Sequence, residues 1–345
     1  MASPEGVSSK FDLLTIGDCT VDIFTFPERA DVHCQLHGKQ SWQKVDGSAK
    51  PNLAAAKERR CELCLSAADK VSSKGFDLTF GGNAANVAVG ASRLGLRTGI
   101  YTHVGRDLFG GETLENFKKE KVDTSLVEMD DEQATNVNII ISSGGERTIL
   151  TAHQPRHYLV PSVYAPWVYF SSLAPGHDYF HSPFVRYVHE NRIKLAFNPG
   201  SYQIKEGLAA YGQLLKITEV LILNREEAGR LLGLDHALKT EKELLSRLRD
   251  LGPRIVVVTD GPQGAYAFDG YEFTFQTATG VKAKERTGAG DAFSCGVVTA
   301  LALGRPLKEA LKWGTLNAES VTQAVGAQTG LLSRKELEPL VKKLK

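Results

Sequence analysis

The chain is poor in the features that build a disulfide scaffold, a membrane span or a nucleic-acid-binding surface. Only five cysteines occur among 345 residues, too few for a disulfide framework in a chain of this length. No uninterrupted apolar run approaches the length of a membrane span, and the polar N-terminus, MASPEGVSSK, does not resemble a signal peptide. Lys and Arg (41) nearly cancel Asp and Glu (40). We therefore expect a cytoplasmic protein with neither nucleic acid nor a membrane as its partner.

Two standard nucleotide-binding motifs are also missing. The sequence contains no G-x-x-x-x-G-K-[ST], which excludes a P-loop enzyme of the usual kind. No G-x-G-x-x-G follows the first expected strand, so a nicotinamide-dependent dehydrogenase is not supported.

What the sequence does contain is a repeated alternation of short β-branched runs and helical patterns. The segment 11–17 (FDLLTIG) reads as a strand, 83–95 (NAANVAVGASRLG) as an amphipathic helix ending on glycine, and 98–105 (TGIYTHVG) as the next strand. The same rhythm continues towards the C-terminus. It predicts an α/β protein with a doubly wound, mostly parallel sheet covered by helices on both faces. We expect a single domain over residues 1–345.

Residues 24–80 interrupt this alternation. They are polar, charged and irregular, which is typical either of a lid or small accessory subdomain, or of a solvated surface excursion. The insert also carries five candidate zinc ligands, although a pair of thiols buried in the lid is the simpler interpretation. These residues are His33, Cys34, His37, Cys61 and Cys64.

Small, polar and acidic residues follow several of the expected strands. Because ligands of open α/β sheets bind beyond the carboxyl ends of the strands, these residues are candidates for a common site. They are Asp18, Asp22, Gly105–Asp107, Asn198–Gly200, Asn224, Glu227, Thr259, Gly261 and Gly264.

The segment 284–293 (KERTGAGDAF) allows two interpretations. Gly and Asp before an apolar run are ordinary signals for a helix start. Alternatively, the small residues Gly288, Ala289 and Gly290 let backbone N–H groups converge at a helix N-terminus and bind an anion such as phosphate. Asp291, directly after this turn, would then be placed to accept a proton from an attacking hydroxyl.

Asn224 and Glu227 also have two interpretations. They are three residues apart and share one helix face, where their oxygens suit Mg²⁺ and its water shell. The simpler interpretation is a helix cap.

Five segments, taken together and in order, resemble the ribokinase-like, PfkB-type carbohydrate kinase family. They are GGNAANVAVGASRLG (81–95), VGRDLFG (104–110), NREE (224–227), TDGPQGA (259–265) and RTGAGDAF (286–293). The resemblance covers roughly residues 11–332, and its two glycine-rich signatures are specific to that family.

This resemblance implies a three-layer α/β/α fold with a small β lid, and transfer of the γ-phosphate of ATP to an alcohol group, usually a CH₂OH of a sugar or nucleoside. By the same resemblance, Asp291 is the base and Gly288, Ala289 and Gly290 form the anion hole. The resemblance also implies that Asn224 and Glu227 organise Mg²⁺ through water and that Asn198 approaches the phosphates. It places Thr259, Gly261 and Gly264 on the nucleotide side and Asn317 at the purine. The residues that it implies for sugar binding are Asp22, Gly81, Gly82, Asn83 and Asn86.

Departures from the family pattern leave two points open, the K⁺ site and the identity of the acceptor. Glu285-Arg286 stands where relatives often have Asp-Thr, which weakens the case for a K⁺ site, and Thr20 stands where many sugar kinases have Asn. The acceptor is therefore a sugar or a nucleoside, with a catalytically idle sensor as the remaining alternative.

A homodimer formed through the lid is common in the family. A loose basic group, Arg147, His153, Arg156 and His157, is expected on the surface or, alternatively, at a substrate phosphate.

Overall fold

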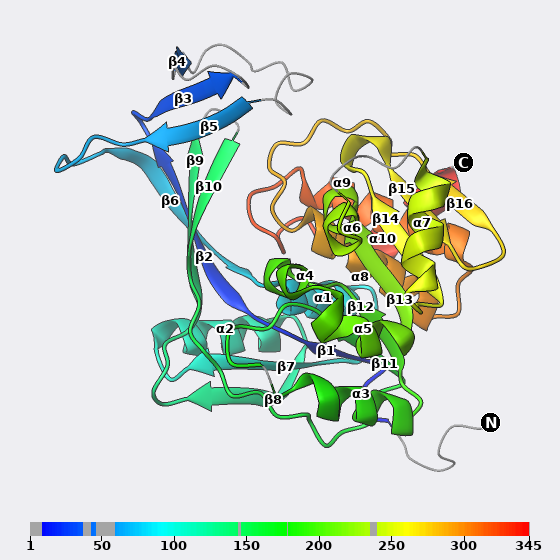
Figure 1. Ribbon diagram of the computed structural model, residues 1–345. Helices are drawn as coiled ribbons and strands as arrows, with labels where there is room; N and C mark the ends of the chain where they lie inside the picture. Colours follow the sequence, from blue (N-terminus) through cyan, green and yellow to red (C-terminus); the bar gives the residue numbers. More distant parts are fainter. Residues whose placement is uncertain are drawn as a thin grey trace. The chain divides into compact units, whose positions relative to one another are not determined.

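A computed structural model describes residues 9–36, 43–45, 59–143, 146–177, 179–234 and 240–344, and divides the chain into two compact units (Figure 1). The first unit comprises residues 1–20, 80–136 and 153–345, and the second comprises residues 21–79 and 137–152.

The first unit is built on a nine-stranded sheet in the order β16-β15-β14-β13-β12-β11-β1-β7-β8. The seven strands from β14 to β8 run parallel, and β15 and β16 extend one edge antiparallel. The strands are β1 (Leu13–Ile16), β7 (Thr98–Gly105), β8 (Asp123–Asp130), β11 (Trp167–Phe170), β12 (Lys194–Phe197), β13 (Thr218–Asn224), β14 (Ile255–Thr259), β15 (Ala265–Phe268) and β16 (Phe273–Gln276).

Helices cover both faces of this sheet, because successive strand residues point to opposite sides. In β11, for example, Val168 and Phe170 enter one core, and Trp167 and Tyr169 enter the other. The first core packs against α3 (His181–Glu190), α4 (Ser201–Glu206), α5 (Leu208–Lys216), α6 (Arg225–Leu231) and α7 (Glu241–Asp250). The opposite face packs against α1 (Asn83–Arg93), α2 (Leu108–Lys119), α8 (Ala289–Ala302), α9 (Leu307–Val321) and α10 (Arg334–Lys343). The predicted three-layer α/β/α fold is confirmed.

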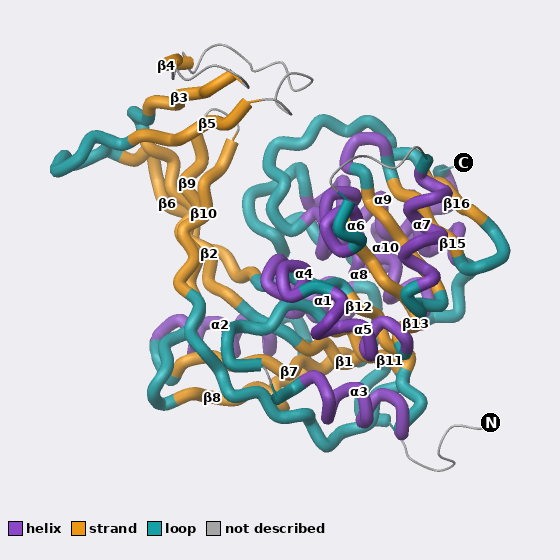
Figure 2. The backbone as a smooth tube through the Cα atoms, in the orientation of Figure 1, coloured by secondary structure: helices purple, strands orange, loops and turns teal. Residues whose placement is uncertain are grey.

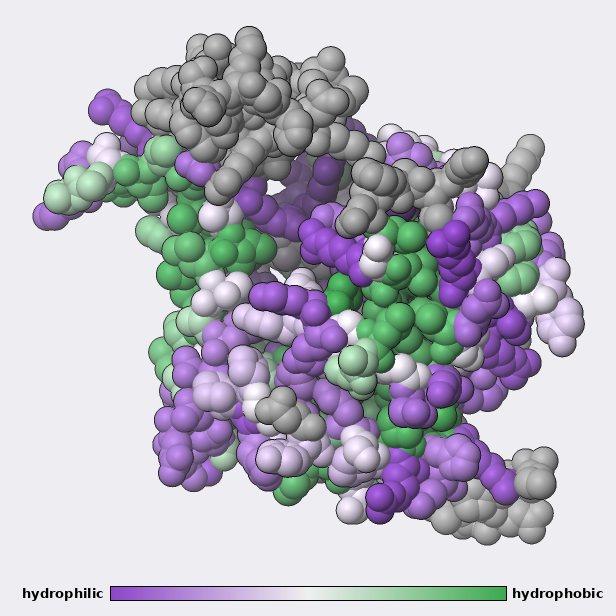
Figure 3. All heavy atoms as spheres, viewed as in Figure 1, coloured by the Kyte–Doolittle hydropathy of each residue, from purple (hydrophilic) through white to green (hydrophobic). Residues whose placement is uncertain are grey.

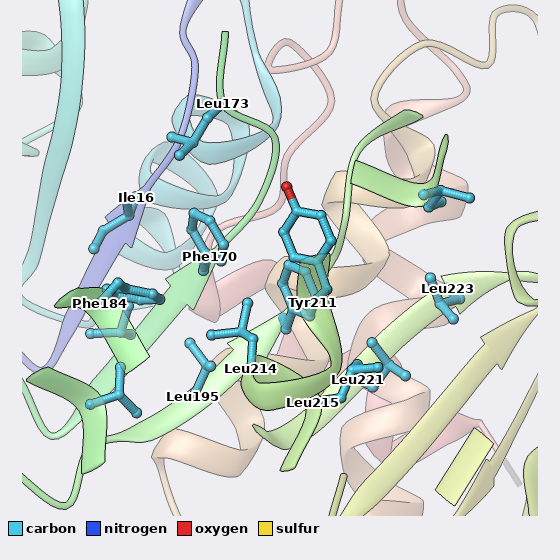
Figure 4. Close-up of a cluster of buried hydrophobic side chains, with 14 of the residues drawn as sticks. Ile16, Phe170, Leu173, Phe184, Leu195, Tyr211, Leu214, Leu215, Leu221 and Leu223 are labelled. Carbon is cyan, nitrogen blue, oxygen red and sulfur yellow. The ribbon is translucent and has the colours of Figure 1, made fainter. Parts of the chain in front are cut away.

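The first of these cores is rich in aromatic rings (Figure 4). Phe170 of β11 and Phe184 of α3 lie together with Leu195 of β12, while Tyr211 and Leu214 of α5 pack over the neighbouring strands. Figure 2 shows how helices and strands alternate along the first unit.

The order of the strands fixes where a ligand would bind. From β1 the chain continues to β7 and β8 on one side, and later passes to β11 on the other side. The crossovers therefore diverge between β1 and β11, and in doubly wound sheets the crevice at this switch point, beyond the carboxyl ends of the strands, is the usual ligand site.

The second unit has a four-stranded sheet in the order β10-β9-β2-β6 and a three-stranded sheet in the order β4-β3-β5. In the first of these sheets β9 and β10 pair antiparallel. The strands are β2 (Thr20–Pro27), β3 (Asp31–Leu36), β4 (Gln43–Val45), β5 (Arg59–Cys64), β6 (Ser73–Gly81), β9 (Val137–Ser143) and β10 (Glu146–Ala152). The unit thus joins most of the 24–80 insert to the hairpin of β9 and β10, and its role as a lid stays a prediction.

The candidate zinc ligands of the insert fall largely outside what the structure describes. The side chains of His33, Cys34, His37 and Cys61 are not among the described ones, so the zinc interpretation stays a prediction. The fifth residue, Cys64, is exposed, so the expectation of a buried thiol is wrong for this cysteine.

The packing of α8 against α9 predicts a sharp difference between two glycine substitutions. A Cβ added at Gly296 of α8 would lie 2.6 Å from the backbone of Trp313 and 2.7 Å from Gly314, both in α9. Gly296→Ala is expected to destabilise the protein by about 1–3 kcal/mol through overpacking. Gly212→Ala in α5 is the control, because no atom of the described chain lies within 4 Å of its added Cβ. Urea unfolding of both variants measures the difference, and equal midpoints would contradict the close helix contact.

Candidate functional site

The Gly288–Gly290 turn forms the N-terminus of α8. Gly288 is the N-cap residue with φ +78°, in the left-handed region that glycine tolerates best. A Cβ added there would lie 2.4 Å from the Cβ of Ala327, so any larger residue would also collide with the neighbouring loop. The helix-start interpretation is therefore confirmed. The first N–H groups of a helix lie at its positive end, where an anion can bind, and in this turn the N–H of Ala289 donates to the carbonyl of Arg286 at 3.3 Å.

Asp291 lies in the first turn of α8, directly after this glycine turn. Its Oδ2 accepts a hydrogen bond of 2.7 Å from Nδ2 of Asn86 in α1. A carboxylate in the first turn of a helix also interacts favourably with the positive end of the helix dipole. The structure thus holds an oriented carboxylate beside a turn whose geometry suits an anion.

Asn224 and Glu227 form a reciprocal helix cap at the carboxyl end of β13. Asn224 Oδ1 accepts from the backbone N–H of Glu227, and Glu227 Oε2 accepts from the backbone N–H of Asn224, each at 2.8 Å. Burial raises the pKa of the Glu227 carboxyl. The cap interpretation is confirmed. The Mg²⁺ interpretation stays a prediction. Asn224 Oδ1 and Glu227 Oε2 each accept a bond of the cap, and Glu227 Oε1 appears in none of the described hydrogen bonds.

Asn198 lies just past the end of β12 and ties three strands together. Its Oδ1 accepts from the hydroxyl of Tyr169 at 3.0 Å, and its Nδ2 donates to the carbonyl of Ile222 at 2.8 Å. These two hydrogen bonds hold the side chain in place, and the approach of Asn198 to phosphates stays a prediction.

The nucleotide-side residues lie around the end of β14. Thr259 is the register partner of Asn224 in the neighbouring strand, so the two candidate positions are adjacent at the sheet edge. Gly261 has φ +51° and begins a short 3₁₀ turn. Gly264 has φ +119°, and its added Cβ would lie 2.1 Å from the carbonyl oxygen of Gln276. These glycines are required by the turn itself, whatever ligand lies beside it.

Asn317 of α9 is completely buried. Its Nδ2 donates to the carbonyl of Ala292 at 2.8 Å, and its Oδ1 accepts from the backbone N–H of Leu332 at 3.0 Å. The carboxamide thus joins α8, α9 and the loop before α10. A purine contact by Asn317 stays a prediction, with both ends of its amide engaged inside the protein.

The expected sugar-binding residues fall in both units and are described separately. In the first unit, Gly82 has φ +93° and its added Cβ would lie 2.4 Å from the carbonyl oxygen of Asp18. The glycine at 82 is thus needed for close approach of the chain to itself. Gly81, Gly82 and Asn83 lead into α1, where Asn86 is only 3% exposed. In the second unit, Asp22 accepts a hydrogen bond of 2.8 Å from Asn138.

A buried polar cluster follows β1. Asp18 Oδ1 accepts from the hydroxyl of Tyr158 at 2.7 Å and from the backbone N–H of Ala174 at 3.0 Å. Desolvation raises the pKa of Asp18 to about 6. Sequence reasoning found Asp18 from its place after the strand, but no periodic signal marks Tyr158.

The expected surface position of the basic group is wrong for one of its members, Arg156. Its side chain is buried and forms an ion pair with Asp130 at 2.8 Å, and it also donates to the carbonyl of Gln133. The expected surface position of Arg156 is therefore wrong, and its contact with a substrate phosphate stays a prediction. The sequence shows no apolar pattern around Arg156 that would have revealed its burial.

Glu285, which departs from the family pattern just before the glycine turn, is hydrogen-bonded to Thr287 of the same loop. Glu285 accepts two hydrogen bonds from Thr287, one from its backbone N–H at 2.8 Å and one from its hydroxyl at 2.7 Å. Both carboxylate oxygens of Glu285 are thus turned back onto the loop. Among the described residues, no group of three or more His, Cys, Asp or Glu side chains could hold a metal ion.

Three comparisons with known proteins bear on this arrangement, namely with a family model, with individual relatives and with solved structures. The model of the pfkB family of carbohydrate kinases matches residues 47–334, most of the chain. The protein therefore belongs to the pfkB family and is a carbohydrate kinase by family. No helix of the described chain is both long and apolar enough to span a membrane.

Individual relatives agree with this assignment. Ribokinase of Haemophilus influenzae is 24% identical over 281 residues, which cover 78% of this chain and 89% of that protein. The structure of Arabidopsis thaliana ribokinase with ribose and ATP matches with a TM-score of 0.74 and 19% identity, over 99% of each chain. A nucleoside kinase of Methanocaldococcus jannaschii matches with a TM-score of 0.72 and 18% identity, over 97% of this chain and 100% of that chain. The similar structures show that the fold is ribokinase-like.

The buried Asp18 carboxyl predicts a pH dependence of stability. Its pKa is about 6 in the folded protein and about 4 when unfolded, so the folded state binds the proton more tightly. This contribution is fully present below pH 4 and is lost as the pH rises to about 6, at most about 3 kcal/mol. Asp18→Asn keeps an oxygen for Tyr158 and Ala174 but does not ionise. Relative to wild type, the variant should therefore gain stability between pH 4 and pH 7 in denaturant titrations. A stability difference that does not change with pH would contradict the assignment.

Proposed function

We propose that the protein transfers the γ-phosphate of ATP to a hydroxymethyl or other alcohol group of a sugar or sugar-like small molecule, with Asp291 as the general base. The observation that carries this proposal is the position of Asp291 in the first turn of α8, immediately after the Gly288–Gly290 turn. One short segment thus offers a proton acceptor and a set of amide donors for the transferring group.

The two parts of the segment have complementary tasks. Asp291 accepts the proton of the acceptor hydroxyl as its oxygen bonds to phosphorus and the bond to the leaving diphosphate breaks. The N–H groups of Gly288, Ala289 and Gly290, at the positive end of α8, are directed at the charge on the transferring phosphoryl oxygens. Small side chains keep this approach open, and no atom of the described chain lies within 4 Å of a Cβ added at Gly290.

The nucleotide side of the proposed site uses the strand ends next to α8. We assign phosphate contacts to Asn198 and nucleotide contacts to Thr259, Gly261, Gly264 and Asn317. Support comes from the carboxyl ends of β12, β13 and β14, which lie at one edge of a parallel sheet. ATP as the donor is supported by the family and by the ribokinase neighbour solved with ATP.

Asn224 and Glu227 are the residues that would hold Mg²⁺, through water. Their oxygens are hard ligands, and the cap leaves Glu227 only one oxygen, Oε1, outside its described bonds, which fits an outer-shell role better than direct coordination. When bound, Mg²⁺ supplies positive charge between the phosphates. Both carboxylate oxygens of Glu285 accept hydrogen bonds from Thr287, which argues against a K⁺ ion bound by Glu285.

We assign sugar contacts of the first unit to Gly81, Gly82 and Asn83, and those of Asn86 and, in the second unit, of Asp22 stay predictions. Asp and Asn side chains pair with vicinal hydroxyls. The acceptor is a free sugar or, as the second candidate, a nucleoside, which the nucleoside kinase neighbour of the same fold favours. A panel of sugars and nucleosides assayed for ADP formation separates the two. Ligand binding without any ADP formation would instead support an idle sensor.

Replacing the proposed base predicts a loss of turnover. Asp291→Asn keeps the size of the side chain and removes the proton acceptor, so kcat should fall by roughly 10² to 10⁴-fold. Asp250→Asn, an exposed acid at the end of α7, is the matched control. Steady-state ADP release and a thermal melt are measured for both variants. Near-normal turnover in a folded Asp291→Asn variant would contradict the role of Asp291.

We also propose that the protein forms a homodimer through the second unit. Ile139 of β9 and Leu150 of β10 are register partners on one face of its sheet, and they are 41% and 52% exposed. Phe76 and Leu78 of β6 are also exposed, and Figure 3 shows apolar side chains gathered over the strands of this sheet. Exposed apolar residues that are neighbours on one sheet face, as Ile139 and Leu150 are, are typical of an interaction surface.

The dimer has a direct test. Leu150→Glu places a charge on the apolar face and should shift the protein from dimer to monomer in light scattering at micromolar concentration. Tyr271→Glu is the control, since Tyr271 is an exposed aromatic residue of the first unit. Equal masses for Leu150→Glu and wild type would argue against this interface.

A further inference from the structure

Three carboxamide side chains form a chain of hydrogen bonds that ends on Asp291. Asn116 Nδ2 in α2 donates to Gln328 Oε1 at 3.0 Å, and Gln328 Nε2 donates to Asn86 Oδ1 at 3.2 Å. Asn86 Nδ2 then donates to Asp291 Oδ2 at 2.7 Å. All four residues belong to the first unit, and Gln328 lies in the loop that follows α9.

The direction of each amide in this chain is forced by its neighbours. A carboxylate only accepts, so Asn86 must turn its NH₂ group towards Asp291 and its oxygen towards Gln328. Gln328 must then donate through Nε2, which leaves its Oε1 to accept from Asn116. Reversing one amide would set oxygen against oxygen at the next contact. The NH₂ group that Asn86 presents to Asp291 therefore depends on Asn116, which is two hydrogen bonds away from Asn86.

Gln328 is itself firmly held. Arg93 Nη1 donates to the backbone carbonyls of Gln328 at 2.8 Å and Leu331 at 3.0 Å. The same guanidinium makes two hydrogen bonds of 2.8 Å to the carboxylate of Glu120. A bidentate pair of this kind fixes the guanidinium plane, so the backbone beneath the Gln328 side chain has little freedom.

Burial makes these bonds hard to replace. Asn86 is 3% exposed and Gln328 is 7% exposed, so water has little access to either amide. In such surroundings a hydrogen bond is electrostatically stronger than in water, and a lost partner leaves a buried polar group unsatisfied.

The same loop also supports the glycine turn. Ala327, the residue before Gln328, lies against Gly288, where an added Cβ would come within 2.4 Å of the Ala327 Cβ. One short segment thus contacts the turn on one side and, through Asn86, orients Asp291 on the other.

We propose that Gln328 is a positioning residue for phosphoryl transfer, which acts through Asn86 to fix the direction of the Asp291 carboxylate. The inference rests on the proposed role of Asp291 as the general base and assigns Asn86 to that carboxylate. Because proton transfer requires a defined approach of the hydroxyl to one carboxylate oxygen, loss of orientation lowers kcat and leaves substrate affinity unchanged.

The first experiment removes the carboxamide and keeps the side-chain length. Gln328→Met should lower kcat by roughly 10 to 10²-fold, with KM for ATP and for the acceptor within about twofold of wild type. Gln323→Met is the control, a glutamine of the same loop whose Nε2 donates to the carbonyl of Lys282 and the hydroxyl of Thr322. A wild-type kcat in folded Gln328→Met would overturn the proposal.

The second experiment reverses the chain of amides from its far end. Asn116 lies on a partly exposed position of α2, where substitution leaves the core intact. Asn116→Asp replaces the donor by an acceptor, so Gln328 and then Asn86 must turn over and present an oxygen to Asp291. Asn116→Ala removes the donor without this reversal. The fall in kcat should therefore be larger for Asn116→Asp than for Asn116→Ala, and this order decides the question even if Gln328→Met fails to fold.

The outcomes also separate this inference from the proposed function. If Asp291→Asn turns over normally, the general-base role fails and the positioning role fails with it. If Asp291→Asn is inactive but Gln328→Met and Asn116→Asp keep the wild-type kcat, only the positioning role is overturned. If both are correct, Gln328→Met causes no further loss when added to Asp291→Asn, because the carboxylate that it orients is gone.

Discussion

The hydrogen bond from Asn86 to Asp291 joins two helices whose contacting residues are 205 positions apart in the sequence. It requires α1 and α8 to pack closely on the same face of the central sheet, and glycine makes this possible. A Cβ added at Gly90 of α1 would lie 2.5 Å from the Sγ of Cys295 in α8. Close contact through glycine brings the two side chains within reach, so the position of Asp291 depends on the packing of the whole helical layer.

The same helical layer explains why several polar side chains are buried there. Asn317 joins α8 to α9 and to the loop that leads into α10, while Gln328 and Arg93 hold the neighbouring part of that loop. Such groups cost free energy when they are only partly satisfied and rigidify the structure when every partner is present. Here each carboxamide has a donor and an acceptor partner. The arrangement favours a single orientation of the N-terminal turn of α8, as the proposed phosphate-binding role of this turn requires.

Much of the fold could be predicted from the sequence, because strand and helix periodicities are local. The alternation of β-branched runs and amphipathic segments predicts the three layers, and the residues after each strand predict the edge where Asn198, Asn224 and Thr259 lie. The partners of these residues could not be predicted in the same way. Arg156 reads as a surface cation, yet it is buried against Asp130, and no local pattern shows that Asn86 is hydrogen-bonded to both Asp291 and Gln328. Such pairings join distant parts of the chain, and no local pattern records them.

Two carboxyl groups of the first unit show how surroundings divide similar side chains between different tasks. Asp18, after the first strand, is enclosed by Tyr158 and the Ala174 backbone, and burial raises its pKa to about 6. Asp291 lies instead at the positive end of a helix and receives a donated amide hydrogen bond. Burial disfavours the charged form of a carboxyl group, so the pKa of Asp18 is raised although its carboxylate accepts two hydrogen bonds. The two groups thus differ in position: Asp291 lies beside the glycine turn, as the proposed base requires, whereas Asp18 is enclosed after the first strand.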